Sequence, residues 1–207
     1  LINSLHEYYQ TTEIDLLVND DTLPVARLLP YVNYIHIFSY KKRRDNRLKQ
    51  EKELIKSIYR KYDLSINLTA SDRSVLYALF ASKKSISAVE QNKKKSWWKK
   101  ILLTHFYYFD TKKHILLNNL ESLNLLKIKH DNIQLSPDIS NVSIDRVKKK
   151  LSKKGIKDFV IFHPSAQYKY KIYNQFSRDK LLTYLSSLGL SIVITGSNNK
   201  IDSEIKL

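Results

Sequence analysis

Hydrophobic residues along this chain gather in two kinds of segment that alternate. Short apolar or alternating runs predict strands at residues 14–18, 34–38, 64–69, 85–89, 159–162 and 190–195. Apolar residues at three-to-four spacing predict helices at residues 23–29, 47–61, 114–126, 143–154 and 175–188, with another capped by Ser71 or Asp72. Strands that alternate with helices form βαβ units, so the pattern predicts an α/β fold with parallel sheets.

The alternation is interrupted between Asp131 and Ile144. This segment contains Pro137 and several Asn, Asp and Ser residues, which favour turns and loops. We therefore expect an inter-domain connection here, with one domain over residues 1–140 and a second over residues 141–207.

Polar residues follow two predicted strands of the second domain. His163-Pro164-Ser165 comes directly after one strand, and Thr195-Gly196-Ser197 follows another. Parallel sheets bind ligands at the carboxyl ends of their strands, where a serine hydroxyl and loop N–H groups can bind phosphate. Lys169 and Lys171 follow closely and could neutralise a diphosphate, although the same residues would suit an ordinary loop with two solvated lysines.

Several common sites are absent from the sequence. The chain contains no G-x-G-x-x-G, no phosphate-binding Walker lysine loop and no G-x-S-x-G nucleophile elbow. It has no D-x-D, and its six histidines lack the spacing of metal ligands. Cysteine is absent, which excludes disulfides and thiol nucleophiles and is consistent with a reducing cytosol. We therefore expect neither a bound metal nor a cofactor.

The formal net charge is +16, which favours anionic partners without choosing among them. Lysine and arginine concentrate in three runs at residues 41–44, 93–100 and 148–154, which would also suit solvated loops and helix faces. The Trp97-Trp98 pair in the second run allows three interpretations: a membrane-interface anchor, stacking on nucleic acid, or core packing of one indole. No apolar run approaches the 18 residues of a membrane-spanning helix.

Motifs in both predicted domains resemble those of one enzyme family. The segment 62–69 followed by Arg73-Ser74, and the later segments 159–166, 171–174 and 192–196, resemble the lipopolysaccharide heptosyltransferases of glycosyltransferase family 9. The residues 97–100 and 118–120 look most like the heptosyltransferase III branch. The resemblance rests on the order and spacing of weak motifs over about residues 13–205.

The resemblance implies two Rossmann-like domains facing a cleft, the GT-B architecture. The first would lie on the acceptor side, and the second would bind the nucleotide sugar. The family's reaction is an inverting, metal-independent transfer, typically of heptose from ADP-heptose to the lipopolysaccharide inner core. The resemblance thus implies a cytoplasmic enzyme in peripheral contact with the inner membrane, acting on an anionic glycolipid, with no nucleic acid as partner.

The resemblance also suggests site residues. Ser165 matches a hydroxyl residue at the donor diphosphate, and Lys171 matches the lysine of a K-x-W-P signature, with Lys169 as the substitute. Tyr173 and Asn174 depart from that signature, which weakens the match of Lys171. The strand that ends in Thr195-Gly196 would contact the nucleotide. By position in the resemblance, Asp202 or Glu204 would bind the nucleotide ribose, and Arg73 would bind the phosphorylated acceptor.

Family features expected at both ends fall outside the 207 residues. The family starts with a strand, a glycine-containing loop and an Asp proposed as general base, which would precede Leu1. Its D-[ST]-G-x-x-H segment would follow Leu207. We therefore expect both domains to be truncated and this polypeptide to be inactive alone, with the catalytic residue unknown. The alternatives are a non-catalytic basic α/β module that binds nucleic acid or an acidic membrane, and a catalytically inactive relative.

Overall fold

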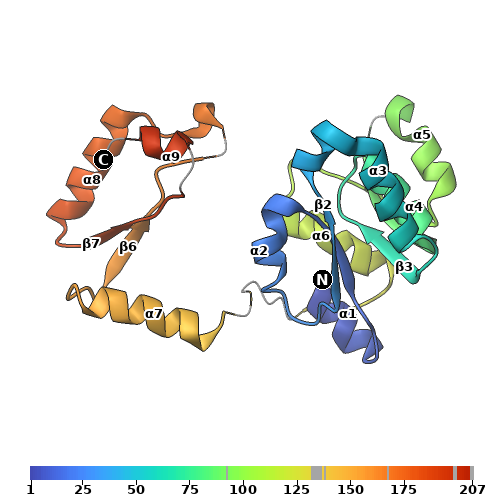
Figure 1. Cartoon of the computed structure of the whole chain (residues 1–207), viewed down its shortest axis with the longest axis horizontal. Coiled ribbons are helices and arrows are strands. Elements are labelled where there is room, and N and C mark those ends of the chain that lie inside the picture. The colour runs from blue at the N-terminus through green and yellow to red at the C-terminus, as the bar shows by residue number, and fades with distance from the viewer. Residues whose placement is uncertain (92, 132–136, 138, 167, 198–199, 206–207) are drawn as a thin grey trace. The chain divides into compact units, whose positions relative to one another are not determined.

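The structure, a computed structural model, describes residues 1–91, 93–131, 137, 139–166, 168–197 and 200–205 (Figure 1). The side chains of residues 41–45, 93, 95, 200 and 201 are outside this description. The chain divides into two compact units, unit 1 over Leu1–Asp138 and unit 2 over Ile139–Leu207. Each unit is described by itself.

Unit 1 is built from parallel strands joined by helical crossovers. Its helices are α1 (Ile2–Tyr9), α2 (Leu23–Ala26), α3 (Tyr40–Ile58), α4 (Asp72–Ala81), α5 (Lys93–Leu102) and α6 (Ile115–Leu125), and a 3₁₀ turn covers Asp20–Thr22. Its strands are β1 (Asp15–Asn19), β2 (Tyr34–Phe38), β3 (Tyr62–Asn67), β4 (Ser82–Val89) and β5 (His105–Tyr108). β1 pairs with β2, and β3, β4 and β5 form a second sheet in that order.

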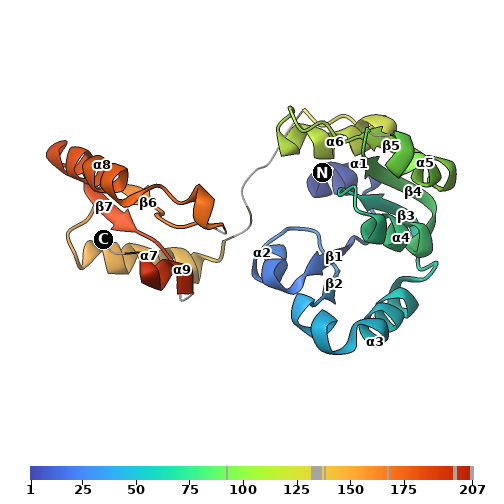
Figure 2. The same ribbon diagram turned by 90° about the horizontal axis from the view of Figure 1, so that it is seen from above.

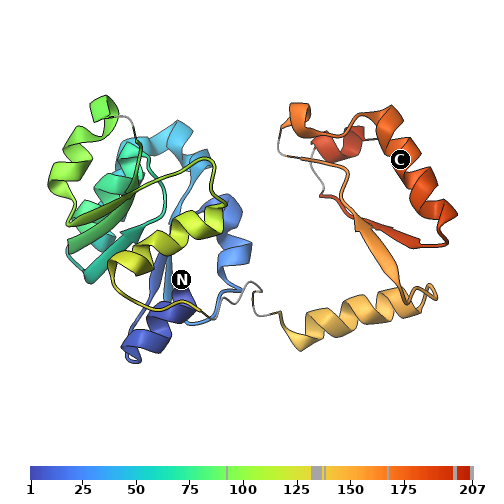
Figure 3. The same ribbon diagram turned by 180° about the vertical axis from the view of Figure 1, so that it is seen from behind.

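The core of unit 1 lies on both faces of the β3-β4-β5 sheet. On one face, Val89 of β4 packs with Val75 of α4 and Leu103 after α5. On the other face, Ile86 and Ala88 pack with Tyr107, and Leu126 after α6 lies against them. α6 also packs along α1, as the turned views show (Figures 2 and 3).

Unit 2 contains one parallel strand pair. Its elements are α7 (Asn141–Ser152), β6 (Phe159–Phe162), a 3₁₀ turn η2 (Lys169–Lys171), α8 (Gln175–Ser187), β7 (Ser191–Ile194) and α9 (Lys200–Glu204). Ser140 and Asn174 cap α7 and α8 by accepting backbone N–H groups. Gly155 and Gly189 follow these helices with φ of 66° and 71°, a conformation that ends a helix. The predicted α/β class with parallel sheets is confirmed in both units.

The structure corrects several predicted elements. It adds α1, α5 and β5, and it moves the strand expected at 64–69 to Tyr62–Asn67. The helix expected at 47–61 starts at Tyr40, with a kink at Asn46. The apolar spacing of the helix expected at 114–126 predicts Leu117 on its buried face, but Leu117 is 51% exposed. It lies on the outer side of α6, because Leu120 and Leu123 set the buried direction.

Candidate functional site

His163 joins the two loops that leave β6 and β7 at their carboxyl ends. Its Nδ1 lies 3.0 Å from the Thr195 carbonyl oxygen and 3.1 Å from the Thr195 hydroxyl, and its Nε2 lies 3.2 Å from Ser165 Oγ. A carbonyl oxygen only accepts, so the proton of the neutral ring sits on Nδ1, and Nε2 accepts from Ser165. Two predicted site residues, Ser165 and Thr195, are thus brought together by His163, for which the sequence alone indicates no role.

This arrangement controls what Ser165 can offer a ligand. While the ring is neutral, the Ser165 hydroxyl donates its proton to His163 and presents only lone pairs elsewhere. When the ring is protonated, both ring nitrogens donate, and the hydroxyl proton becomes available to a phosphate oxygen.

Gly196 and Asp202 form the second part of this edge. The Asp202 carboxylate of α9 accepts a hydrogen bond from the Ser197 backbone N–H. A Cβ at Gly196 would lie 3.3 Å from Asp202 Oδ2, tighter than most such contacts, so glycine leaves room for the carboxylate. The structure therefore brings these two predicted residues together, with one carboxylate oxygen already bonded to the loop.

The predicted cationic residues take separate positions. Lys169 Nζ lies 3.3 Å from Glu204 Oε2, an exposed ion pair that contributes little to stability and leaves both groups accessible to a ligand. Lys171 Nζ lies 5.5 Å from the centre of the Tyr168 ring and 5.8 Å from that of Tyr170, and these two rings are stacked. The tyrosine pair was not predicted, and it holds the Lys171 ammonium by cation–π attraction.

Arg73 lies in unit 1, in the first turn of α4 after β3. Its guanidinium carbon is 4.0 Å from the centre of the Phe38 ring, and its Nη2 donates to the Tyr40 hydroxyl over 3.2 Å. Hydroxyl groups gather beside it, where Ser74 Oγ lies 2.6 Å from Thr69 Oγ1 and 2.7 Å from Ser71 Oγ. A guanidinium next to several hydroxyls suits a phosphorylated or polyhydroxylated ligand.

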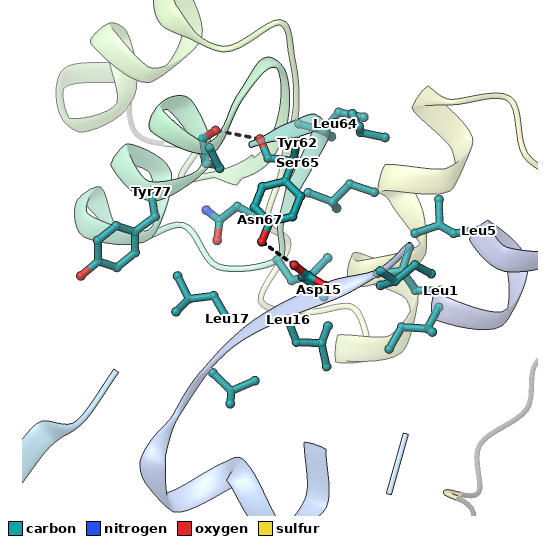
Figure 4. A pocket seen from close by; sticks show the side chains of 18 of the residues that line it. Leu1, Leu5, Asp15, Leu16, Leu17, Tyr62, Leu64, Ser65, Asn67 and Tyr77 are labelled. Carbon is teal, nitrogen blue, oxygen red and sulfur yellow. Dashed lines mark hydrogen bonds between the residues drawn. The ribbon is translucent and has the colours of Figure 1, made fainter. Parts of the chain in front are cut away.

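These groups border a cavity of about 1890 Å³ within unit 1. At its other end, where β1 and β3 begin, the Tyr62 hydroxyl donates to the Asp15 carboxylate over 2.6 Å (Figure 4). His36 Nε2 lies 2.7 Å from the same hydroxyl, and Lys61 Nζ lies 3.1 Å from Asp15. This polar cluster connects β1 and β2 to β3, although the two sheets are not paired.

The charges in this cluster follow from burial and hydrogen bonding. Burial alone would raise the pKa of Asp15, but hydrogen bonds from Tyr62 and Lys61 hold it below its ordinary value. Burial lowers the pKa of His36, while burial and the Asp15 hydrogen bond raise the pKa of Tyr62. Asp15 is therefore ionised and His36 neutral at pH 7, which suits a structural role.

Two other kinds of feature are missing from the described residues. Their histidines, aspartates and glutamates nowhere form a group of three that could hold a metal ion. None of the described helices is long and apolar enough to cross a membrane.

Comparison with known proteins gives one consistent result. No protein-family model matches the chain. Lipopolysaccharide heptosyltransferase 3 of Escherichia coli K12 is 26% identical over 199 residues, which are 94% of this chain and 57% of that protein. A second E. coli lipopolysaccharide heptosyltransferase 3 is 25% identical, over 98% of this chain and 60% of that protein. This chain resembles the lipopolysaccharide heptosyltransferases. The predicted resemblance is confirmed.

Solved structures agree with the heptosyltransferase resemblance. A family 9 glycosyltransferase from Veillonella parvula aligns with a TM-score of 0.74 at 17% identity, over 95% of this chain and 57% of its own. E. coli heptosyltransferase WaaC with ADP-2-deoxy-2-fluoro heptose aligns with a TM-score of 0.69 at 11% identity, over 95% and 64%. The fold is thus that of family 9 glycosyltransferases, the GT-B architecture, and the chain spans about 57–64% of these proteins' lengths.

Proposed function

We propose that the protein is a heptosyltransferase that transfers heptose from ADP-heptose to the lipopolysaccharide inner core. The transfer would invert the anomeric centre and need no metal. The observation that carries this proposal is the edge at which His163 joins Ser165 to Thr195, within a chain that resembles heptosyltransferases over 94% of its length. The choice of donor is supported by two solved structures with the same fold, E. coli heptosyltransferase WaaC with ADP and with ADP-2-deoxy-2-fluoro heptose.

In this proposal the two domains bind different substrates. Residues 1–140 would face the acceptor, and residues 141–207 would hold the nucleotide sugar. Ser165, Lys171 and Lys169 would bind the donor diphosphate, and the Thr195-Gly196 loop would contact the nucleotide. Asp202 or Glu204 would bind the ribose, while Arg73 would bind a phosphate of the acceptor.

The chemistry of an inverting transfer explains these roles. A base takes the proton of the acceptor hydroxyl while donors stabilise the diphosphate that leaves. Ammonium groups at Lys169 and Lys171 would neutralise that diphosphate where other transferases use a metal ion. The general base is assigned to none of these 207 residues.

The acceptor side of the proposal rests on charge. The lipopolysaccharide inner core carries carboxylates and phosphates, and the chain has a formal net charge of +16. Such a glycolipid substrate would place the enzyme in the cytoplasm, in peripheral contact with the inner membrane. An enzyme that meets its acceptor there has no need of nucleic acid as a partner.

The Lys171→Ala variant is expected to bind ADP about tenfold more weakly than the unchanged protein, because it loses one charge-assisted contact with the diphosphate. Isothermal titration calorimetry with ADP and ADP-heptose measures the loss. Lys180→Ala is the matched control, since Lys180 Nζ also lies over an aromatic ring, 4.6 Å from the centre of Phe176. Its affinity should stay within about twofold. Absence of ADP binding by the unchanged protein would contradict the proposed function.

A further inference from the structure

Helix α5 buries a charged side chain and exposes large apolar ones, the reverse of the usual arrangement. Lys99 is fully buried on its inner side, together with Ser96. Trp97 and Ile101 are 61% and 71% exposed on its outer side, and Leu102 at the end of the helix is more than half exposed. We call Trp97, Ile101 and Leu102 the α5 ridge. Trp97 and Ile101 lie about 40° apart around the helix axis, so they form one continuous strip.

The inner contacts prevent α5 from turning this ridge inward. Lys99 Nζ lies 2.8 Å from a Glu90 carboxylate oxygen, 2.7 Å from Asp72 Oδ1 and 2.5 Å from the Ala70 carbonyl oxygen. Trp98 packs on the cluster of Val75, Val89 and Leu103. The structure therefore distinguishes the two indoles: Trp98 is partly buried against the core, and Trp97 faces outward.

Positive charge accompanies the exposed ridge. The first three residues of α5 are lysines, and Lys94 falls on the same side of the helix as Trp97 and Ile101. Lys100 lies on a flank, where its Nζ is 3.1 Å from the Tyr108 hydroxyl, and the Tyr108 side chain is itself exposed. An apolar strip with an indole and flanking lysines is complementary to a bilayer surface that carries anionic headgroups.

We infer that the α5 ridge is the surface through which the protein docks on an anionic lipid bilayer. The helix has ten residues and is about 15 Å long, so it lies in the plane of the interface and does not cross it. Ile101 and Leu102 are aliphatic and offer nothing for a base to stack on, which favours lipid over nucleic acid. The inference deepens the membrane contact in the proposed function by naming the residues that make it.

The first test uses the two tryptophans, which are the only ones in the chain. The Trp98→Phe variant keeps Trp97 as its one indole. Its emission should shift to shorter wavelength on vesicles of phosphatidylcholine and phosphatidylglycerol, and brominated lipid should quench it. The Trp97→Phe variant is the control, because its remaining indole packs in the core and should be quenched far less.

The second test measures vesicle affinity by co-sedimentation. The Trp97→Ser/Ile101→Ser double variant should bind anionic vesicles at least about tenfold more weakly, since it loses most of the ridge. Leu48→Ser is the matched control, because Leu48 is 85% exposed on α3, and its affinity should stay within about twofold. Vesicles of phosphatidylcholine alone should bind weakly.

Three outcomes would overturn the inference. Vesicle binding that the double variant leaves unchanged would place the membrane contact elsewhere and leave the proposed function intact. Absence of vesicle binding would contradict this inference and also the membrane contact in the proposed function. ADP calorimetry would still test the transferase activity independently. Binding of RNA that the double variant weakens, without vesicle binding, would assign the ridge to nucleic acid.

Discussion

The Glu90→Ala variant is expected to lose about 3 kcal/mol of the free energy of unfolding of unit 1, because it leaves the Lys99 charge without its main partner. Glu90 supplies both of its carboxylate oxygens to the Lys99 ammonium, at 2.8 and 3.0 Å. Asp72 and the Ala70 carbonyl remain in contact, but the Asp72 side chain is largely exposed to water and compensates less. Denaturant unfolding followed by tryptophan fluorescence measures the loss in unit 1 alone, since both tryptophans lie on α5.

A second substitution separates the buried charge from packing. In the Glu90→Ala/Lys99→Met double variant the buried Lys99 charge is gone, and at least half of the lost free energy should return. A double variant as unstable as Glu90→Ala itself would show that the carboxylate acts through packing or through its bond from Ser96.

The same ion pair gives a dependence on pH. Burial alone would raise the pKa of Glu90, but hydrogen bonds from Lys99 and Ser96 hold it below its ordinary value of 4.5. A carboxylate whose pKa is lower in the folded chain than in the unfolded chain stabilises the fold at pH values above its unfolded pKa. This stabilisation is lost as the pH falls through its folded pKa. Unfolding free energies measured from pH 6 to pH 3 should therefore fall more steeply for the unchanged protein than for Glu90→Ala.

The Leu123→Ala variant is expected to lose about 3 kcal/mol of unfolding free energy, because it opens a cavity between α6 and α1. Leu123 is fully buried and packs with Leu120 and Ile128, and Leu1 and Leu5 of α1 lie against this cluster. Leu117→Ala is the matched control, since Leu117 lies on the same helix with half its side chain exposed, and it should lose less than about 1 kcal/mol. Equal losses in the two variants would show that α1 does not pack on α6 as described.

The sequence predicts the strands that form short apolar runs bounded by polar or turn residues. The runs at 14–18, 34–38, 159–162 and 190–195 correspond to β1, β2, β6 and β7 within a residue or two. α5 is not predicted because its pattern of burial is the reverse of an ordinary amphipathic helix: Lys99 is buried, and Ile101 is exposed. β5 escapes because its four residues belong to the apolar stretch 101–109, in which periodicity alone cannot separate helix from strand.

The candidate site is predictable only where it depends on local topology. Ser165 and Thr195 follow strands that pair in parallel, so the βαβ pattern already places them at one edge of a sheet. The approach of Asp202 to Gly196 depends on how α9 packs, and the stacking of Arg73 on Phe38 joins residues 35 positions apart. Neither contact leaves a periodic signal in the sequence.

The parallel pairing of every strand among the described residues also determines how the chain can fold. No two of these strands are joined by a hairpin turn, so the first pair must form across a closed loop with a helix inside it. The loops from Asp15 to Tyr34, Tyr62 to Ser82 and Ile86 to His105 are shorter than the loop from Phe159 to Ser191. Loop-closure entropy therefore favours each pairing in unit 1 over that of β6 with β7 by about 0.4 kcal/mol, and β3, β4 and β5 gain from two such crossovers that share the central strand.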